Sequence, residues 1–188
     1  DNVFVKNKIN LKAAIKFQYD TYFEIVGGAQ LLRASNFPFF QDTTLAGKFD
    51  INISEQITKV AGFANLLFHL GPNGVLYSES ELQLTKNDDG KYIPYNPLFW
   101  NQTSYGYLFE FGLAAKIKSY ISFGTYSDIE NTNKLPMYFN LALELGYKIS
   151  DNFSITLNLE NLLNKQNFIY KNYKEKPVDA ILGFSYYW

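Results

Sequence analysis

Apolar and polar side chains alternate along much of this chain with a period of two residues. The segments 105–117, 137–149 and 153–159 show the alternation most clearly, with large apolar residues at their odd positions. Successive side chains of a β-strand point to opposite faces of a sheet, so this period is typical of a strand rather than a helix. Thirteen alternating residues exceed the ordinary globular strand of about five or six. The pattern therefore predicts long strands with one apolar face and one polar face.

Further strands are predicted where the alternation is shorter or less regular. These segments are 9–17, 23–32, 45–53, 60–70, 75–84, 118–126 and 179–188. Short turns are predicted at Asp20-Thr21, at Gly71-Pro72-Asn73-Gly74, at Lys118-Ser119 and at 150–152. The Gly71–Gly74 signal is the strongest, because Gly, Pro and Asn each favour turn conformations.

Long polar stretches separate other strands. They cover 86–97, 127–134 and 164–177. Short turns at one end and long loops at the other are expected of a membrane β-barrel. This alternation of connections holds from the C-terminus back to Gly71–Gly74. Before that it fails, because the connection predicted at 36–42 is long and the one predicted at 54–56 is short. Either a further strand lies at 92–100, or the connections of the amino-terminal half are unusual. We therefore predict about ten strands, within a range of 8–12, in an up-and-down meander.

The last ten residues, Asp179–Trp188, favour a membrane over water. The residues that share one face of this strand are Ala180, Leu182, Phe184, Tyr186 and Trp188. A strand that faces lipid gains from an apolar band and from aromatic residues at the interface. The chain also has 17 Phe and 15 Tyr, but no run of about 18 apolar residues that could form a transmembrane helix. We predict an all-β fold, an antiparallel transmembrane β-barrel of the bacterial outer membrane.

A soluble β-sandwich or a lipocalin-like barrel is the alternative fold. Such proteins also alternate apolar and polar residues, but they bury the apolar face and expose the polar one. In that case Phe184, Tyr186 and Trp188 would lie in a protein core. The length of the strands and the aromatic C-terminus favour the membrane barrel.

In a membrane barrel the polar faces of the strands point into the lumen and the apolar faces meet lipid. The residues predicted to face the lumen are Lys12, Lys16, Glu24, Lys48, Asp50, His69, Glu79, Glu81, Glu110, Lys116, Glu144, Lys148 and Glu160. The residues predicted to face lipid are Phe109, Phe111, Phe139, Leu141, Leu143, Ile155, Leu157, Leu182 and Phe184. Lumen charges of both signs suit either a structural network that fills a narrow barrel or a polar conduit through a wider one.

Few residues of this chain suit catalysis, metal binding or nucleic-acid binding. His69 is its single histidine and it has no cysteine, so we expect no metal site and no cofactor. Glu79 and Glu81 share a face but lack a histidine partner, and no nucleotide-binding or hydrolase motif is present. A net charge of -1 gives no reason to expect a nucleic-acid partner. We therefore expect a protein that is not an enzyme.

Three segments resemble parts of a known family. Residues 157–165 read L-N-L-E-N-L-L-N-K, residues 92–97 read Y-I-P-Y-N-P, and residues 182–186 read L-G-F-S-Y. Together with the loop-like stretch 170–177, they are similar to the C-terminal part of the barrel of TonB-dependent receptors, over roughly residues 75–188. The resemblance implies a role in transport, namely the active uptake of a scarce ligand such as a metal chelate through the outer membrane.

The same resemblance leaves the extent of the barrel open. Receptors of that family have a far longer barrel, an amino-terminal plug and a TonB box, which do not fit into 188 residues. Residues 1–188 are therefore either a C-terminal piece of such a barrel or one compact barrel domain. A compact barrel would be a passive pore, an adhesin or a structural envelope protein.

The closing strand also implies partners. With Phe184, Tyr186 and Trp188, it resembles the signal that the barrel-assembly machinery reads on outer-membrane barrels. We therefore expect that machinery and outer-membrane lipid as partners, together with further subunits or the rest of a larger receptor.

Overall fold

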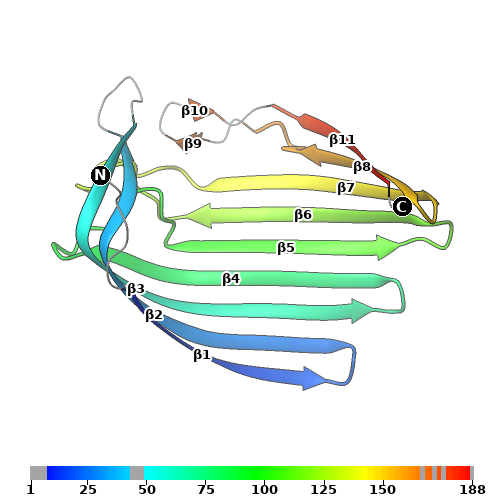
Figure 1. Ribbon diagram of the computed structural model, residues 1–188, viewed down its shortest axis with the longest axis horizontal. Coiled ribbons are helices and arrows are strands. Elements are labelled where there is room, and N and C mark those ends of the chain that lie inside the picture. The colour runs from blue at the N-terminus through cyan, green and yellow to red at the C-terminus, as the bar shows by residue number, and fades with distance from the viewer. Residues whose placement is uncertain (1–7, 43–48, 166–167, 171–172, 175–176, 187–188) are drawn as a thin grey trace.

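The chain forms one large antiparallel sheet. The computed structural model describes residues 8–42, 49–165, 168–170, 173–174 and 177–186. Its strands are β1 (Lys8–Tyr19), β2 (Phe23–Asp42), β3 (Phe49–Leu70), β4 (Gly74–Asn87), β5 (Phe99–Leu108), β6 (Leu113–Phe123), β7 (Tyr138–Ser150), β8 (Phe153–Glu160), β9 (Phe168–Tyr170), β10 (Tyr173–Lys174) and β11 (Asp179–Tyr186). Nine of them pair in the order β1-β2-β3-β4-β5-β6-β7-β8-β11, and β9 and β10 form a separate hairpin (Figure 1).

This order confirms the predicted all-β antiparallel meander. Each of the first seven strands pairs with the strand that follows it in the sequence, and β8 pairs with β11. Among the described residues, β1 and β11 are not paired with each other, so the sheet is open and has nine strands where about ten were predicted in a closed barrel. Across the same residues, no helix has the length and apolar character needed to cross a membrane.

The strand predicted at 105–117 is wrong, because the structure breaks it with a turn. β5 ends at Leu108 and β6 begins at Leu113. The Phe109 N–H donates to the Leu113 carbonyl oxygen at 2.8 Å, and Gly112 has a φ of 85° that suits glycine. Four residues form the turn, an even number, so the period of two runs on through it unchanged.

Three further predicted connections are wrong. The long connection predicted at 36–42 lies within β2, and the short one predicted at 54–56 lies within the 22-residue β3. The turn predicted at Lys118-Ser119 lies within β6, which continues to Phe123. No strand covers 92–98, and β5 begins at Phe99. Short turns now lie at one end of the sheet, the short-turn end, and longer connections at the other, the long-loop end (Figure 1).

Cross-strand register places the apolar residues on one face of the sheet. Direct partners in antiparallel strands share a face. A row of partners runs from Leu76 of β4 through Tyr105, Ile117 and Leu143, while Leu157 is the partner of Leu182. We call this side the apolar face. Its side chains include several that are widely exposed, such as Ile15 at 82% and Phe184 at 63%.

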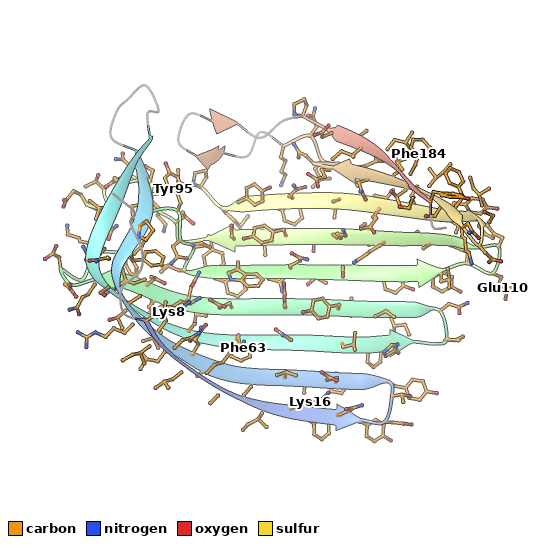
Figure 2. All side chains as sticks on the ribbon, in the orientation of Figure 1. Lys8, Lys16, Phe63, Tyr95, Glu110 and Phe184 are labelled. Atoms are coloured by element: carbon orange, nitrogen blue, oxygen red, sulfur yellow. The ribbon has the colours of Figure 1, made fainter. Side chains whose placement is uncertain are left out.

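Aromatic rings gather on the apolar face at the short-turn end. Phe23 contacts Phe17 and Phe68 with ring centroids 6.5 and 6.0 Å apart. At the far side of the sheet, Phe153 stacks on Phe184 at 6.4 Å. Figure 2 shows many rings at this end, near the labelled Phe184 and Glu110. Such a belt of aromatic residues is typical of a membrane–water interface.

One polar cluster interrupts the apolar face. The Asn101 side-chain amide donates to the hydroxyl oxygens of Ser78 and Ser80 at 3.0 and 2.8 Å, and to the Glu79 carbonyl oxygen at 3.0 Å. The Thr103 hydroxyl donates to the Asn101 amide oxygen at 3.0 Å. These groups bond to one another, so much of their need for water is met within the sheet.

Hydrogen bonds and a pair of stacked rings join the two long loops, 88–98 and 124–137, at the long-loop end of the sheet. The Tyr92 N–H donates to the Asn131 amide oxygen at 2.7 Å, and the Asn131 amide donates back to the Tyr92 carbonyl oxygen at 2.9 Å. The rings of Tyr92 and Tyr126 stack with centroids 5.8 Å apart. The side chain of Asn131 in the second loop thus satisfies both backbone polar groups of Tyr92 in the first.

Asp128 shapes the second of these loops. Its carboxylate accepts hydrogen bonds from the backbone N–H groups of Thr132 and Asn133 at 3.0 and 2.7 Å. Burial alone would raise the pKa of Asp128, but the hydrogen bonds from Thr132 and Asn133 together lower it below its ordinary value of 3.8.

We predict that loop 124–137 opens locally as the pH falls. Because the folded-state pKa of Asp128 is lowered, its stabilisation is complete above 3.8 and is lost as the pH falls through the folded-state value. Amide hydrogen exchange, expressed as protection factors at Thr132 and Asn133, should show this loss. In Asp128→Ala, protection should be weak at every pH. Strong protection of the wild type that does not change with pH would contradict the prediction.

Gly28 of β2 lies where neighbouring strands approach closely. It is opposite Phe63 of β3, and a Cβ atom at this position would lie 2.6 Å from the Phe63 ring and 2.2 Å from the Ala13 carbonyl oxygen. A Cβ atom added at Gly27 would lie 3.9 Å from its nearest neighbour, the Phe63 carbonyl oxygen, which is an ordinary contact distance.

We predict that Gly28→Ala destabilises the sheet, because the new methyl group must displace backbone and ring. The expected loss is about 1–3 kcal/mol, the usual cost of overpacking, and it can be measured by urea unfolding. Gly27→Ala is the matched control and should change the stability far less. Equal losses for the two variants would show that close packing at Gly28 is not the cause.

Candidate functional site

The face opposite the apolar face carries most of the charged residues predicted for the lumen, and we call it the polar face. Register places on it the predicted residues Lys12, Lys16, Glu24, His69, Glu79, Glu81, Lys116, Glu144, Lys148 and Glu160. Glu110 is not among them, because it lies in the turn between β5 and β6. Lys48 lies outside the described residues, as does the side chain of Asp50.

The residues predicted to face lipid can be placed in the same way. Those on the apolar face are Phe139, Leu141, Leu143, Ile155, Leu157, Leu182 and Phe184. Phe109 and Phe111 lie instead in the turn after β5, with 36% and 66% of their surface exposed. Of the predicted assembly signal, Phe184 and Tyr186 end β11 on the apolar face and Trp188 lies outside the described residues.

Three ion pairs link neighbouring strands across the polar face. They join Lys16 to Glu24 at 2.6 Å, Lys59 to Glu81 at 2.5 Å, and Lys118 to Glu144. Each pair is diagonal. The direct partners of Lys16 and Lys118 are two residues from the glutamate, a diagonal that long side chains can span. The direct partner of Lys59 is Thr85, four residues from Glu81. The pairs hold much of the positive and negative charge of this face in place.

Sequence reasoning missed the two lysines of the less exposed pairs. Lys59 was outside the strand predicted at 60–70, and Lys118 was placed in a turn. A continuous register would have found them, since both lie at positions that alternate in phase with other polar residues of β3 and β6. The side chains of Lys59 and Glu81 are only 20% and 15% exposed, so their attraction is less screened than that of a surface pair.

Aromatic and amide groups gather on the polar face toward the long-loop end. The Tyr120 and Tyr138 rings meet edge to face at 5.6 Å, and the Asn140 amide donates to the Tyr138 hydroxyl oxygen at 3.1 Å. Trp100 is the direct partner of Glu81 on the same face. These residues were not predicted, because the prediction selected charged positions and counted rings as lipid-facing. Rings beside amides and carboxylates can bind a ligand by stacking and by hydrogen bonds.

Loop 88–98 reaches over this end of the polar face. Ile93 is buried against Ala34 and Ile57, and its N–H donates to the Thr85 carbonyl oxygen at 3.1 Å. The Gln83 amide donates to the Asn96 amide oxygen at 2.8 Å. Ala34 and Ile57 are apolar residues of the polar face, and loop 88–98 packs on them.

Tyr95 marks the same loop as conformationally unusual. Its φ is 57°, in the left-handed region that a bulky residue rarely adopts. The Tyr95 N–H donates to the Tyr126 carbonyl oxygen at 2.8 Å, which ties this strained residue to the second long loop. Residues held in such conformations often belong to ligand clamps or switches.

The described part of the chain does not assemble a metal centre. No group of three or more His, Cys, Asp or Glu residues is placed there to hold a metal ion. His69 lies at the short-turn end of β3, where its backbone N–H donates to the Tyr22 carbonyl oxygen at 2.8 Å.

Comparison with known proteins gives likenesses in structure alone. No protein-family model and no curated protein sequence matches the chain. The ferric-catecholate import receptor Fiu of E. coli K12 matches 95% of this chain with a TM-score of 0.68 and 13% identity. The copper transporter OprC matches 95% with a TM-score of 0.74 and 12% identity. The pyoverdine outer-membrane receptor FpvA of Pseudomonas aeruginosa matches 96% with a TM-score of 0.67 and 14% identity.

The chain covers only part of each of these proteins. It spans 27% of Fiu, 31% of OprC and 30% of FpvA. At these identities the likeness concerns the fold. It confirms, for the fold, the resemblance to the C-terminal barrel portion of TonB-dependent receptors that was predicted from Leu157–Lys165 and its neighbours. Of these similar structures, Fiu is described as an import receptor and FpvA as an outer-membrane receptor.

Proposed function

We propose that this chain is a section of an outer-membrane β-barrel that takes part in transport. The observation that carries the proposal is the separation of the two faces. Large apolar side chains such as Ile15 and Phe184 are exposed on one face, whereas the ion pairs lie on the other. Exposed apolar surface on this scale is stable in lipid and unstable in water. The polar face then lines an aqueous interior.

The open edges of the sheet support a larger barrel. In lipid, every backbone N–H and C=O group needs a partner, so a membrane sheet must close on itself. Among the described residues, β1 and β11 each have one edge without a paired strand. Further strands, from a longer chain or from other subunits, would complete the barrel and leave an interior wider than side chains can fill.

The ligand would be polar and able to stack on rings. Trp100, Tyr120 and Tyr138 lie on the polar face close to carboxylate and amide groups. Loop 88–98 lies over the same end, where a ligand arriving from outside would first meet the barrel. The similar receptors are described as binding or importing ferric catecholates, pyoverdine and copper. A metal chelate is therefore the ligand class we propose.

A structural barrel that transports nothing is the second candidate. It is favoured by the three ion pairs, which hold the charges of the polar face in fixed contacts. A ligand-conducting face would leave more of its charges free to bind what passes.

We predict that deletion of the full-length protein lowers the uptake of one labelled ligand. The ligands to test are a ferric catecholate, ferric pyoverdine and copper, measured as cell-associated label under metal limitation. Restoring the wild-type gene should restore uptake. Unchanged uptake of all three in the deletion strain would favour the structural barrel.

A substitution on each face tests the proposed orientation. Leu157 of β8 is on the apolar face and its neighbour Asn158 is on the polar face. Leu157→Arg should cost about 2–4 kcal/mol of stability in vesicles, because arginine would lie in the bilayer. Asn158→Arg should cost much less, since its direct partner is Glu144. Urea unfolding and heat-modifiable gel mobility measure both variants. Equal losses would contradict the assignment of the apolar face to lipid.

A further inference from the structure

Two cations stand apart from the other charges of the sheet. Among the strand residues whose side chains the structure describes, only Arg33 and Lys86 are charged and lie on the apolar face. Arg33 is the direct partner of Thr58, and Thr58 is the direct partner of Lys86. The three residues therefore form one row across β2, β3 and β4. We call it the cationic row.

The cationic row lies at the edge of the apolar surface, on the long-loop side. The next residues of the apolar face toward the short-turn end are Leu31, Val60 and Leu84, which are 43%, 52% and 46% exposed. The apolar surface ends and positive charge begins within one step of two residues along β2 and β4, and β3 places the hydroxyl of Thr58 between the two cations. In a membrane-embedded sheet, this step is the border between acyl chains and headgroups.

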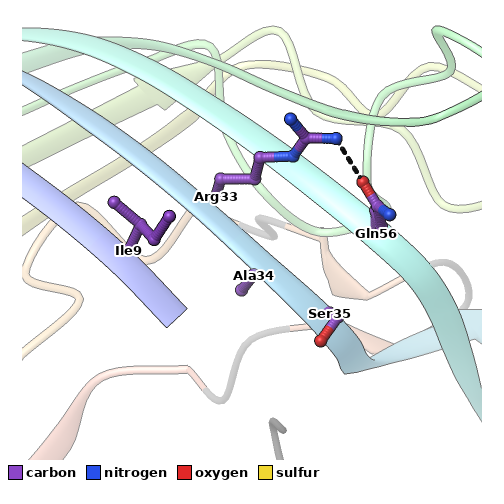
Figure 3. Close-up of a pocket in the computed structure, with 5 residues that line it drawn as sticks. All are labelled: Ile9, Arg33, Ala34, Ser35 and Gln56. Carbon is purple, nitrogen blue, oxygen red and sulfur yellow. Dashed lines mark hydrogen bonds between the residues drawn. The ribbon is translucent and has the colours of Figure 1, made fainter. Parts of the chain in front are cut away.

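Neither cation is neutralised by a carboxylate in the described part of the chain. Arg33 Nη2 donates to the Gln56 amide oxygen at 2.5 Å, and Figure 3 shows this contact beside an open groove that Ile9 also lines. Lys86 Nζ lies 4.8 Å from the centroid of the Tyr92 ring. An amide and a ring orient the two side chains without cancelling their charge.

We propose that the cationic row binds the phosphate of an anionic lipid in the leaflet on the long-loop side. This inference rests on the proposed membrane embedding of the apolar face. Arg33 and Lys86 are two strands apart, roughly 9–10 Å, so both can reach one phosphate placed between them. The guanidinium offers a two-pronged contact, the ammonium a point charge, and the exposed Thr58 hydroxyl a further donor.

The position of the row selects a lipid rather than a free anion. The acyl chains of the bound lipid would lie along Leu31, Val60 and Leu84, directly below the phosphate. A dissolved phosphate would gain nothing from that apolar surface, whereas a lipid gains from both contacts at once. Basic residues near a membrane surface attract anionic lipids for the same reason.

The test measures lipid binding by the full-length protein in a neutral detergent. Phosphatidic acid is the probe, phosphatidylcholine is the reference lipid, and native mass spectrometry counts the bound molecules. The double variant Arg33→Gln/Lys86→Gln should bind phosphatidic acid about 10–30-fold more weakly than the wild type. The matched control Lys8→Gln/Lys134→Gln removes the same charge from the polar face and from loop 124–137, and should keep wild-type affinity.

Each outcome bears on one proposal. Unchanged affinity in the double variant, or an equal loss in the control, would overturn the lipid site. Inorganic phosphate that displaces phosphatidic acid at equal concentration would also overturn it, since the row would then be a general anion site. Flotation of the wild type with vesicles and its heat-modifiable mobility test the membrane barrel separately. Failure there would remove the proposed function itself.

Discussion

The antiparallel register is the constraint on which the rest of this structure depends. Each strand pairs residue by residue with its neighbour, and a slip of one residue would move every side chain to the opposite face. Leucines and ion pairs would then change places across the sheet. Both faces stabilise this register. The apolar face keeps the large apolar side chains together, and the polar face joins neighbouring strands by diagonal Lys–Glu contacts.

Polar groups are present on both faces, but the kinds of partner they bond to differ. On the apolar face, Asn101 gathers the hydroxyls of Ser78, Ser80 and Thr103 into a set that bonds mainly to itself. On the polar face, ion pairs join strands while Trp100 and Tyr120 keep partly exposed rings. The cationic row is a third arrangement, in which positive charge stands at a border and has no acidic partner among the described residues. These three arrangements fit the hydrocarbon, the aqueous interior and the headgroup region of the membrane barrel that we propose.

The errors of sequence analysis have one physical origin. Alternation reports which face a residue occupies, but it does not report where the chain reverses. The Phe109–Gly112 turn has an even number of residues, so the apolar and polar positions stay in phase across it and two strands looked like one. Conversely, the polar residues at 54–56 resemble a turn in the sequence. In the structure they belong to β3, which extends past the end of the apolar surface. The two errors displaced the predicted connections in opposite senses and left the strand count close to the observed one.

Side-chain alternation was enough to predict the all-β class, the meander of long strands and the face of nearly every charged strand residue, because it is a local property of an extended chain. Which residues meet follows only from the folded sheet. Lys59 reaches Glu81, Ile93 packs against Ala34 and Ile57, and Arg33 falls into line with Lys86. These contacts depend on the stagger between strands and on the path of the long loops, which arise from pairing over tens of residues and leave no local trace in the pattern.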